Sequence, residues 1–185
     1  IVKRQLAYGL FEMALTPGGD ALYVASAESF KDVQGGVVYK LDAKTLKTLG
    51  TTHTDLKNFA MQAAANGKTL YVSNSLDGGI SAIDTATGKV KNRLLFSERN
   101  EKGRPYGARQ LLLLNNTLYV GAVADPAQIW GVDATTLKLK TRIKNTGKWM
   151  TGLHYSAQTG RVFSKQKTAY DLLAGDWSSD VCSSD

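Results

Sequence analysis

The sequence predicts an all-β fold, a β-propeller built from four-stranded antiparallel blades. The triplet Leu-Tyr-Val occurs three times, 48 residues apart, at 22–24, 70–72 and 118–120. Each triplet is followed by an apolar residue, an aspartate and a threonine, at 41–45, 83–87 and 132–136. No window shows sustained helical periodicity. Repetition with a period of about 45 residues, each unit holding four short apolar runs, is typical of propeller blades.

The first blade is expected over residues 8–54 and the second over 55–104. In both, short β-branched and apolar runs alternate with turn residues, which predicts four strands per blade. The runs of the first blade are 11–15, 21–25, 36–41 and 46–52. Those of the second are 59–64, 69–74, 79–83 and 89–96, and the Asn66-Gly67 pair between the first two favours a tight hairpin turn.

The third blade is expected over residues 105–148, with strands at 107–114, 117–122, 128–132 and 137–143. Lysine and arginine alternate along 137–144, which is typical of an outermost strand that faces solvent. The fourth blade, 149–175, is incomplete and offers runs at 150–155 and 161–164. Residues 1–175 therefore hold about three and a half blades. Because a closed ring takes four to eight blades, we expect the native protein to be longer.

The last ten residues, 176–185, differ in composition from the rest. They hold four serines, three aspartates and the single cysteine, Cys182, and no lysine or arginine. The string resembles the translation of a sequencing adapter, so we predict that it is not native and leave it out of the functional argument.

Composition excludes several classes of function. Without the tail the chain has no cysteine, which removes disulfides, cysteine metal sites and cysteine nucleophiles. No apolar window is long enough to span a membrane. The chain has a formal net charge of +7, and 23 basic residues face 13 acidic ones once the tail is left out. Such a balance favours an anionic partner or surface.

The chain resembles the YVTN-repeat β-propellers, and most closely the YncE-like periplasmic proteins of Gram-negative bacteria. The resemblance covers roughly residues 3–164, and it is carried by the segments 35–42, 54–57, 82–91, 137–148 and 151–153. It implies a seven-bladed propeller, export to the periplasm through a cleaved signal peptide, and no established enzymatic activity. It also implies single-stranded DNA as a candidate ligand, because such binding has been attributed to a member of this group.

The recurrent aspartates Asp42, Asp84 and Asp133 are interpreted as turn residues rather than as metal ligands or carboxylate pairs, because each begins an Asp-x-x-Thr turn. The histidines His53 and His154 lack the spacing of a shared metal site. No serine nucleophile elbow or phosphate-binding glycine loop occurs. We therefore predict no catalytic residues, no metal and no cofactor.

The segments between one blade's last strand and the next blade's first strand carry the candidate site. Each places an aromatic residue at or near the start of an inner strand, and most add lysine or arginine. Aromatic faces stack on bases and basic side chains neutralise phosphates. The predicted stacking residues are Phe11, Phe59, Tyr106 and Trp149, and the predicted phosphate-binding residues are Lys57, Arg104, Arg109 and Lys148.

Three readings of these residues stay open. In the first, a non-catalytic propeller binds single-stranded DNA or another anionic polymer. In the second, the propeller is an enzyme scaffold, lactonase-like or quinoprotein-like, for which Glu12 and Asp55 are the main acidic residues in the loops. In the third, the propeller has a structural or protein-interaction role. Beside these stands the interpretation that the aromatic residues fill the spaces between blades and the basic residues are solvated.

Overall fold

The computed structural model describes residues 1–28, 35–75, 78–166 and 172–176, and every regular element in them is a β-strand. No helix in this part of the chain is long and apolar enough to cross a membrane. The fifteen described strands form four antiparallel sheets. The all-β prediction is confirmed.

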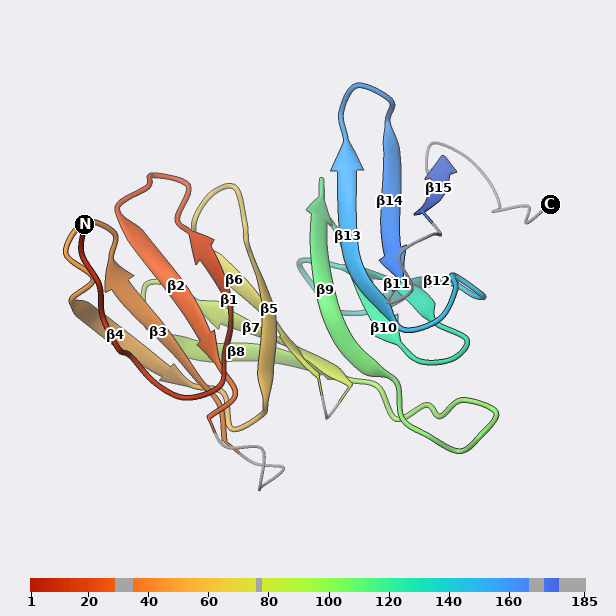
Figure 1. Ribbon diagram of the computed structural model, residues 1–185, viewed down its shortest axis with the longest axis horizontal. Helices are drawn as coiled ribbons and strands as arrows, with labels where there is room; N and C mark the ends of the chain where they lie inside the picture. The colour runs from red at the N-terminus through yellow and green to blue at the C-terminus, as the bar shows by residue number, and fades with distance from the viewer. Residues whose placement is uncertain (29–34, 76–77, 167–171, 177–185) are drawn as a thin grey trace. The chain divides into compact units, whose positions relative to one another are not determined.

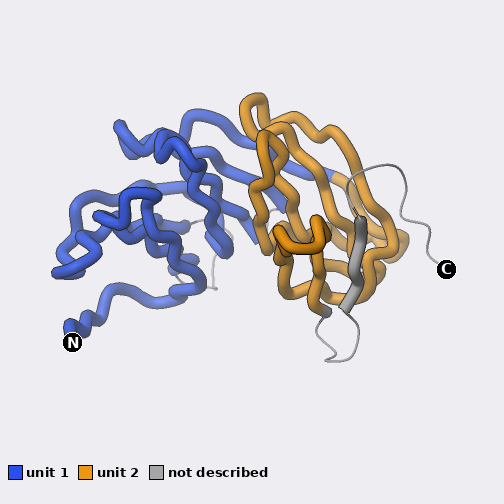
Figure 2. Tube along the Cα trace, turned by 90° about the horizontal axis from the view of Figure 1, so that it is seen from above, with its two compact units in different colours: residues 1–97 blue, residues 98–185 orange. Residues whose placement is uncertain are grey.

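The chain divides into two compact units, residues 1–97 and 98–185 (Figure 2). Unit 1 holds two four-stranded sheets, each a meander in which consecutive strands pair. Sheet 1 consists of β1 (Leu10–Leu15), β2 (Ala21–Ser26), β3 (Val37–Asp42) and β4 (Thr48–His53). Sheet 2 consists of β5 (Asn58–Ala63), β6 (Thr69–Asn74), β7 (Gly79–Asp84) and β8 (Lys89–Leu95).

Unit 2 holds a four-stranded and a three-stranded sheet. Sheet 3 consists of β9 (Gly107–Leu114), β10 (Thr117–Val123), β11 (Gln128–Asp133) and β12 (Leu139–Ile143). Sheet 4 consists of β13 (Met150–Ser156), β14 (Arg161–Gln166) and β15 (Leu172–Asp176). The fourth blade thus gains a strand that the sequence did not predict. Of the predicted non-native tail, Asp176 ends β15 and residues 177–185 lie outside the described part.

Within each unit the first strands of the two sheets lie together, as blades in a propeller require. β1 lies against β5 in unit 1, and β9 lies against β13 in unit 2 (Figure 1). The strand β12, which carries Lys140 and Arg142, ends its sheet at the opposite edge from β9, which confirms its predicted outermost position. The meander places the turns after first and third strands at one end of each sheet. The loops before first strands and after second strands gather at the other end.

The predicted aspartate turns are confirmed. Each carboxylate accepts hydrogen bonds from the backbone N–H groups two and three residues on; for Asp84 these come from Ala86 at 2.9 Å and Thr87 at 3.1 Å. The N–H groups of Thr45 and Thr136 donate in the same way to Asp42 and Asp133, at 2.6 and 2.8 Å. These bonds favour the ionised form and lower the pKa of all three carboxyl groups.

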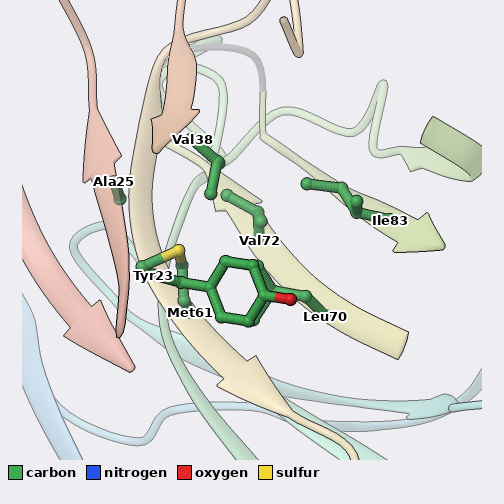
Figure 3. Packing of buried hydrophobic residues seen from close by; sticks show 7 residues of the cluster. All are labelled: Tyr23, Ala25, Val38, Met61, Leu70, Val72 and Ile83. Atoms are coloured by element: carbon green, nitrogen blue, oxygen red, sulfur yellow. The ribbon is translucent and has the colours of Figure 1, made fainter. Parts of the chain in front are cut away.

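Side-chain alternation along the strands builds the core between sheets 1 and 2. Tyr23 and Ala25 on β2 and Val38 on β3 meet Met61, Leu70, Val72 and Ile83 from sheet 2 (Figure 3). Tyr23 and Tyr71 are each 5% exposed, and Tyr119 packs on the core of unit 2 formed by Ala127, Ile129 and Met150. The repeated tyrosines of the Leu-Tyr-Val triplets are therefore packing residues. Burying each large aliphatic side chain contributes about 1.5–3 kcal/mol.

Candidate functional site

In unit 2 three loops meet at the end of the sheets where β9 and β13 begin: residues 98–106, 124–127 and 144–149, here called the unit 2 loop cluster (Figure 1). Backbone hydrogen bonds join two of them. The N–H of Trp149 donates to the carbonyl of Ala124 at 3.0 Å, and that of Ala127 donates to Gly147 at 2.7 Å. These two loops, 124–127 and 144–149, therefore form one bonded framework.

The exposed indole of Trp149 borders a hollow of about 100 Å³, here called the Trp149 hollow. Trp149 is 46% exposed and has a φ of 51°, in the left-handed region that a bulky residue rarely adopts. Lys102, Arg104 and Asp125 also line this hollow. Lys148 lies beside it, with its Nζ 4.0 Å from a carboxylate oxygen of Asp125. The loops thus bring together three of the predicted residues: Arg104, Lys148 and Trp149.

Asn100 organises the loop that carries these cations. Its side-chain oxygen accepts the backbone N–H groups of Lys102 at 3.0 Å and Arg104 at 2.9 Å. Its backbone N–H donates to the Arg104 carbonyl at 2.9 Å. One asparagine therefore closes a compact turn and presents both exposed basic side chains.

A second and larger hollow of about 250 Å³, here called the Tyr106 hollow, lies under the same loops. Its charged lining residues are Glu98, Arg99, Glu101, Arg142 and Lys144, and its uncharged ones include Asn100, Tyr106 and Gln128. Arg142 forms an ion pair with Glu98. One cation is therefore already matched by one anion.

Tyr106 differs from its prediction as an open stacking platform. It is 7% exposed, and its ring stands edge-on to that of the buried Trp130, with 5.7 Å between the centroids. Its hydroxyl oxygen accepts a hydrogen bond from Gln128 at 3.0 Å. The side chain therefore fills space beneath the loops, against Gln128 and Trp130 of β11.

Lys57 differs from its prediction as a phosphate ligand. Its side chain is 2% exposed and its Nζ donates to the Ala27 carbonyl at 3.0 Å. A buried ammonium needs such acceptors, so Lys57 holds the loop after β2 against the start of sheet 2. Phe11 and Phe59 contact each other, with centroids 4.7 Å apart and planes tilted by 37°, and Phe11 is 42% exposed. Arg109 is half-buried in β9.

The acidic and imidazole side chains singled out in the sequence are dispersed. Glu12 accepts the N–H of Met61 at 3.0 Å, and burial raises the pKa of its carboxyl group despite that bond. Asp55, His53 and His154 are exposed. In the described part of the chain, no three or more His, Cys, Asp or Glu side chains lie close enough to share a metal ion.

Comparison with known proteins finds relatives that match most of this chain. The protein named "Uncharacterized protein YncE" of Salmonella typhi is 38% identical over 168 residues, which are 89% of this chain and 48% of that protein. The Escherichia coli K12 protein of the same name is 36% identical over the same share of each chain. This chain is a β-propeller chain that is similar to the YncE proteins. It spans about half the length of these relatives, and no family model matches it.

Solved structures share the fold of the YncE-like chain at low sequence identity. Kuenenia stuttgartiensis hydrazine synthase has a TM-score of 0.74 at 15% identity, covering 93% of this chain and 46% of that one. The dihydro-heme d1 dehydrogenase NirN in complex with DHE has a TM-score of 0.68 at 15% identity, covering 95% and 37%. The Dos1 propeller has a TM-score of 0.66 at 14% identity, covering 84% and 38%. At such identities the likeness concerns the fold alone.

Two polar residues of the candidate site, Asn100 and Gln128, escaped the sequence interpretation, and Lys102 lies in a candidate loop but was not among the predicted phosphate-binding residues. The Asn100-Glu-Lys-Gly103 turn carried a readable signal, because asparagine and glycine at these positions favour a side-chain-closed turn. Gln128 carried none, because its role depends on Tyr106, which lies 22 residues away in the chain.

Proposed function

We propose that this YncE-like chain binds an anionic polymer, with single-stranded DNA as the leading candidate, on the unit 2 loop cluster. The observation that supports the proposal is the exposed indole of Trp149 at a hollow that Lys102 and Arg104 also line. Lys148 lies at the same place. A stacking platform beside several cations is the arrangement that sequence-tolerant single-strand binding uses.

The physical contributions divide between the ring and the cations. A base stacked on an indole contributes about 1–3 kcal/mol. Lys102 and Arg104 are exposed, so phosphates can reach them. Lys148 keeps a weak contact with Asp125 that a phosphate would have to compete with.

The proposal changes the set of residues that was predicted from the sequence. Trp149, Arg104 and Lys148 stay and Lys102 joins them, whereas Lys57 and Tyr106 are assigned to packing. Phe11, Phe59 and Arg109 remain predictions, as do the non-catalytic role and the periplasmic location expected from the resemblance.

Fluorescence anisotropy of a labelled single-stranded oligonucleotide tests the stacking role. Trp149→Ala is expected to weaken binding about five- to 150-fold, the equivalent of one lost stacked base. Trp149→Phe keeps an aromatic face and should retain most of the affinity. Leu49→Ala, which truncates an exposed apolar side chain on β4, is the control and should bind normally. An unchanged dissociation constant for Trp149→Ala, with an unchanged near-ultraviolet circular dichroism spectrum, would reject the proposal.

A further inference from the structure

A directed chain of hydrogen bonds runs beneath the unit 2 loop cluster. The indole N–H of Trp130, which is fully buried, donates to the side-chain oxygen of Gln128 at 3.0 Å. The side-chain nitrogen of Gln128 in turn donates to the hydroxyl oxygen of Tyr106 at 3.0 Å. All three side chains are buried, so each of these bonds is strongly constrained.

The chemistry of the groups fixes the direction of this chain. An indole N–H can only donate, so the Gln128 atom that faces it must be the amide oxygen. The amide nitrogen must then face Tyr106, and the tyrosine oxygen acts as the acceptor. The hydroxyl proton of Tyr106 consequently has to point elsewhere.

The Tyr106 side chain accepts the hydrogen bond from Gln128 and contacts the ring of Trp130, and none of the described residues accepts its hydroxyl proton. Tyr106 and Gln128 both line the Tyr106 hollow. The bond that the hydroxyl oxygen already accepts makes the hydroxyl a better donor. An acceptor atom in the hollow would complete the chain.

The charged side chains that line the Tyr106 hollow favour a negatively charged acceptor. Arg99, Arg142 and Lys144 line the hollow together with Glu98 and Glu101, and Glu98 is matched by Arg142. Arg99 and Lys144 thus exceed the remaining carboxylate, Glu101, by one positive charge. A volume of about 250 Å³ is suited to a small group rather than to a polymer segment.

We infer that the Tyr106 hollow is a binding site for an oxyanion, a phosphate or a carboxylate group, which accepts the hydroxyl proton of Tyr106 and pairs with Arg99 and Lys144. The site is separate from the Trp149 hollow, although Asn100 lines both. The oxyanion belongs either to a free small molecule or to the terminal phosphate of a bound strand, and the chemistry of recognition is the same.

Titration of the ¹⁵N-labelled chain with inorganic phosphate, at constant ionic strength, tests the inference through the indole N–H resonance of Trp130. An acceptor on Tyr106 polarises the whole chain of bonds, so this resonance should shift and saturate with phosphate but not with chloride. Trp149→Phe and Trp177→Phe assign the resonance.

Tyr106→Phe removes the donor but keeps the ring and should weaken phosphate binding about tenfold or more. Tyr155→Phe, in β13 of the same unit, is the matched control and should leave binding unchanged.

Glu101→Gln should have the opposite effect on phosphate affinity. Removing this carboxylate, which has no matching cation among the described residues, should strengthen phosphate binding by about twofold or more. Tighter binding of a 5′-phosphorylated oligonucleotide than of its 5′-hydroxyl form would assign the oxyanion to a strand end, and equal binding would assign it to a free molecule. A non-saturating shift, an equal response to chloride, or an unchanged response in Tyr106→Phe would overturn the inference. Trp149→Ala separates this site from the proposed function: it should abolish strand stacking while the phosphate response of Trp130 persists.

Discussion

Replacing Asn58 by alanine should destabilise unit 1, because this buried side chain joins its two sheets. Asn58 is 1% exposed and stands at the start of β5. Its amide nitrogen donates to the Ser26 carbonyl of sheet 1 at 3.2 Å. Its oxygen accepts from the Thr54 hydroxyl at 2.7 Å and from the Asn74 amide at 3.2 Å.

The expected loss follows from what each partner can do after the substitution. The Thr54 hydroxyl can turn to the Leu56 carbonyl, 3.0 Å away, and so stays bonded. Asn74 loses the hydrogen bond that its amide nitrogen donates within the described chain, and Ser26 loses one acceptor bond. A buried polar group left unsatisfied costs about 1–3 kcal/mol. Because the Asn74 amide loses its acceptor and the Ser26 carbonyl loses one donor, Asn58→Ala should lower the unfolding free energy by about 2–3 kcal/mol.

Hydrogen exchange is the appropriate assay, since Trp130, Trp149 and Trp177 all lie beyond residue 97 and tryptophan fluorescence does not report on unit 1. Amides of β5 and β6 should exchange faster in Asn58→Ala. Asn92→Ala, on the exposed face of β8, should change protection by less than about 0.5 kcal/mol. In the double variant with Asn74→Ala the two losses should not add, because the side chains share one bond. Unchanged protection of β5 and β6 in Asn58→Ala would refute the reasoning.

Two further predictions concern the turns and loops of unit 1. Gly36→Ala should lower the unfolding free energy by about 3 kcal/mol or more, because Gly36 has a φ of 152° and an added Cβ would lie 1.9 Å from the Leu56 carbonyl oxygen. Gly50→Ala is the control, since its added Cβ would meet nothing within 4 Å. Denaturant unfolding followed by tyrosine circular dichroism should show no loss of stability for Gly50→Ala. The pKa of Asp84 is lowered in the folded protein, so its ionised carboxylate stabilises the fold at a pH above the ordinary pKa of 3.8. This stabilisation is lost as the pH falls through the lower pKa of the folded state. The melting temperature of Asp84→Asn should therefore fall less than that of the wild type between about pH 5 and pH 2, and parallel curves would contradict the role assigned to the carboxylate.

The fold was largely predictable because its signals are local and repeated. Leu-Tyr-Val triplets and Asp-x-x-Thr turns lie within single strands and turns, so the sequence alone separates one blade from the next. The strand boundaries were less accurate after these turns. Predicted strands began at Leu46 and Leu137, whereas β4 and β12 begin two residues later. Both leucines have positive φ, 58° and 54°, and close the turn at the position that Gly88 holds in the second repeat.

The candidate site was only partly predictable because its geometry depends on contacts between distant segments. Trp149 and Arg104 were identified from composition, and the structure places both at one hollow. The burial of Lys57 depends on the Ala27 carbonyl, 30 residues away, and that of Tyr106 depends on Trp130. The sequence alone does not show whether a basic or aromatic residue in a loop faces solvent or a neighbouring sheet. Asn58 was overlooked for the same reason, since its partners lie in three different segments.

The salt dependence of oligonucleotide binding tests the central claim, that cations of the unit 2 loop cluster contact phosphates. Plots of log affinity against log salt concentration should be steep for the wild type and shallower by about 1.4 for Lys102→Ala/Arg104→Ala, at about 0.7 per lost phosphate contact. Lys138→Ala/Arg161→Ala removes the same charges from the opposite ends of the strands in the same unit and should keep the wild-type slope. Equal slopes for the two double variants would contradict the account, because binding would then follow net charge and not the loop cluster.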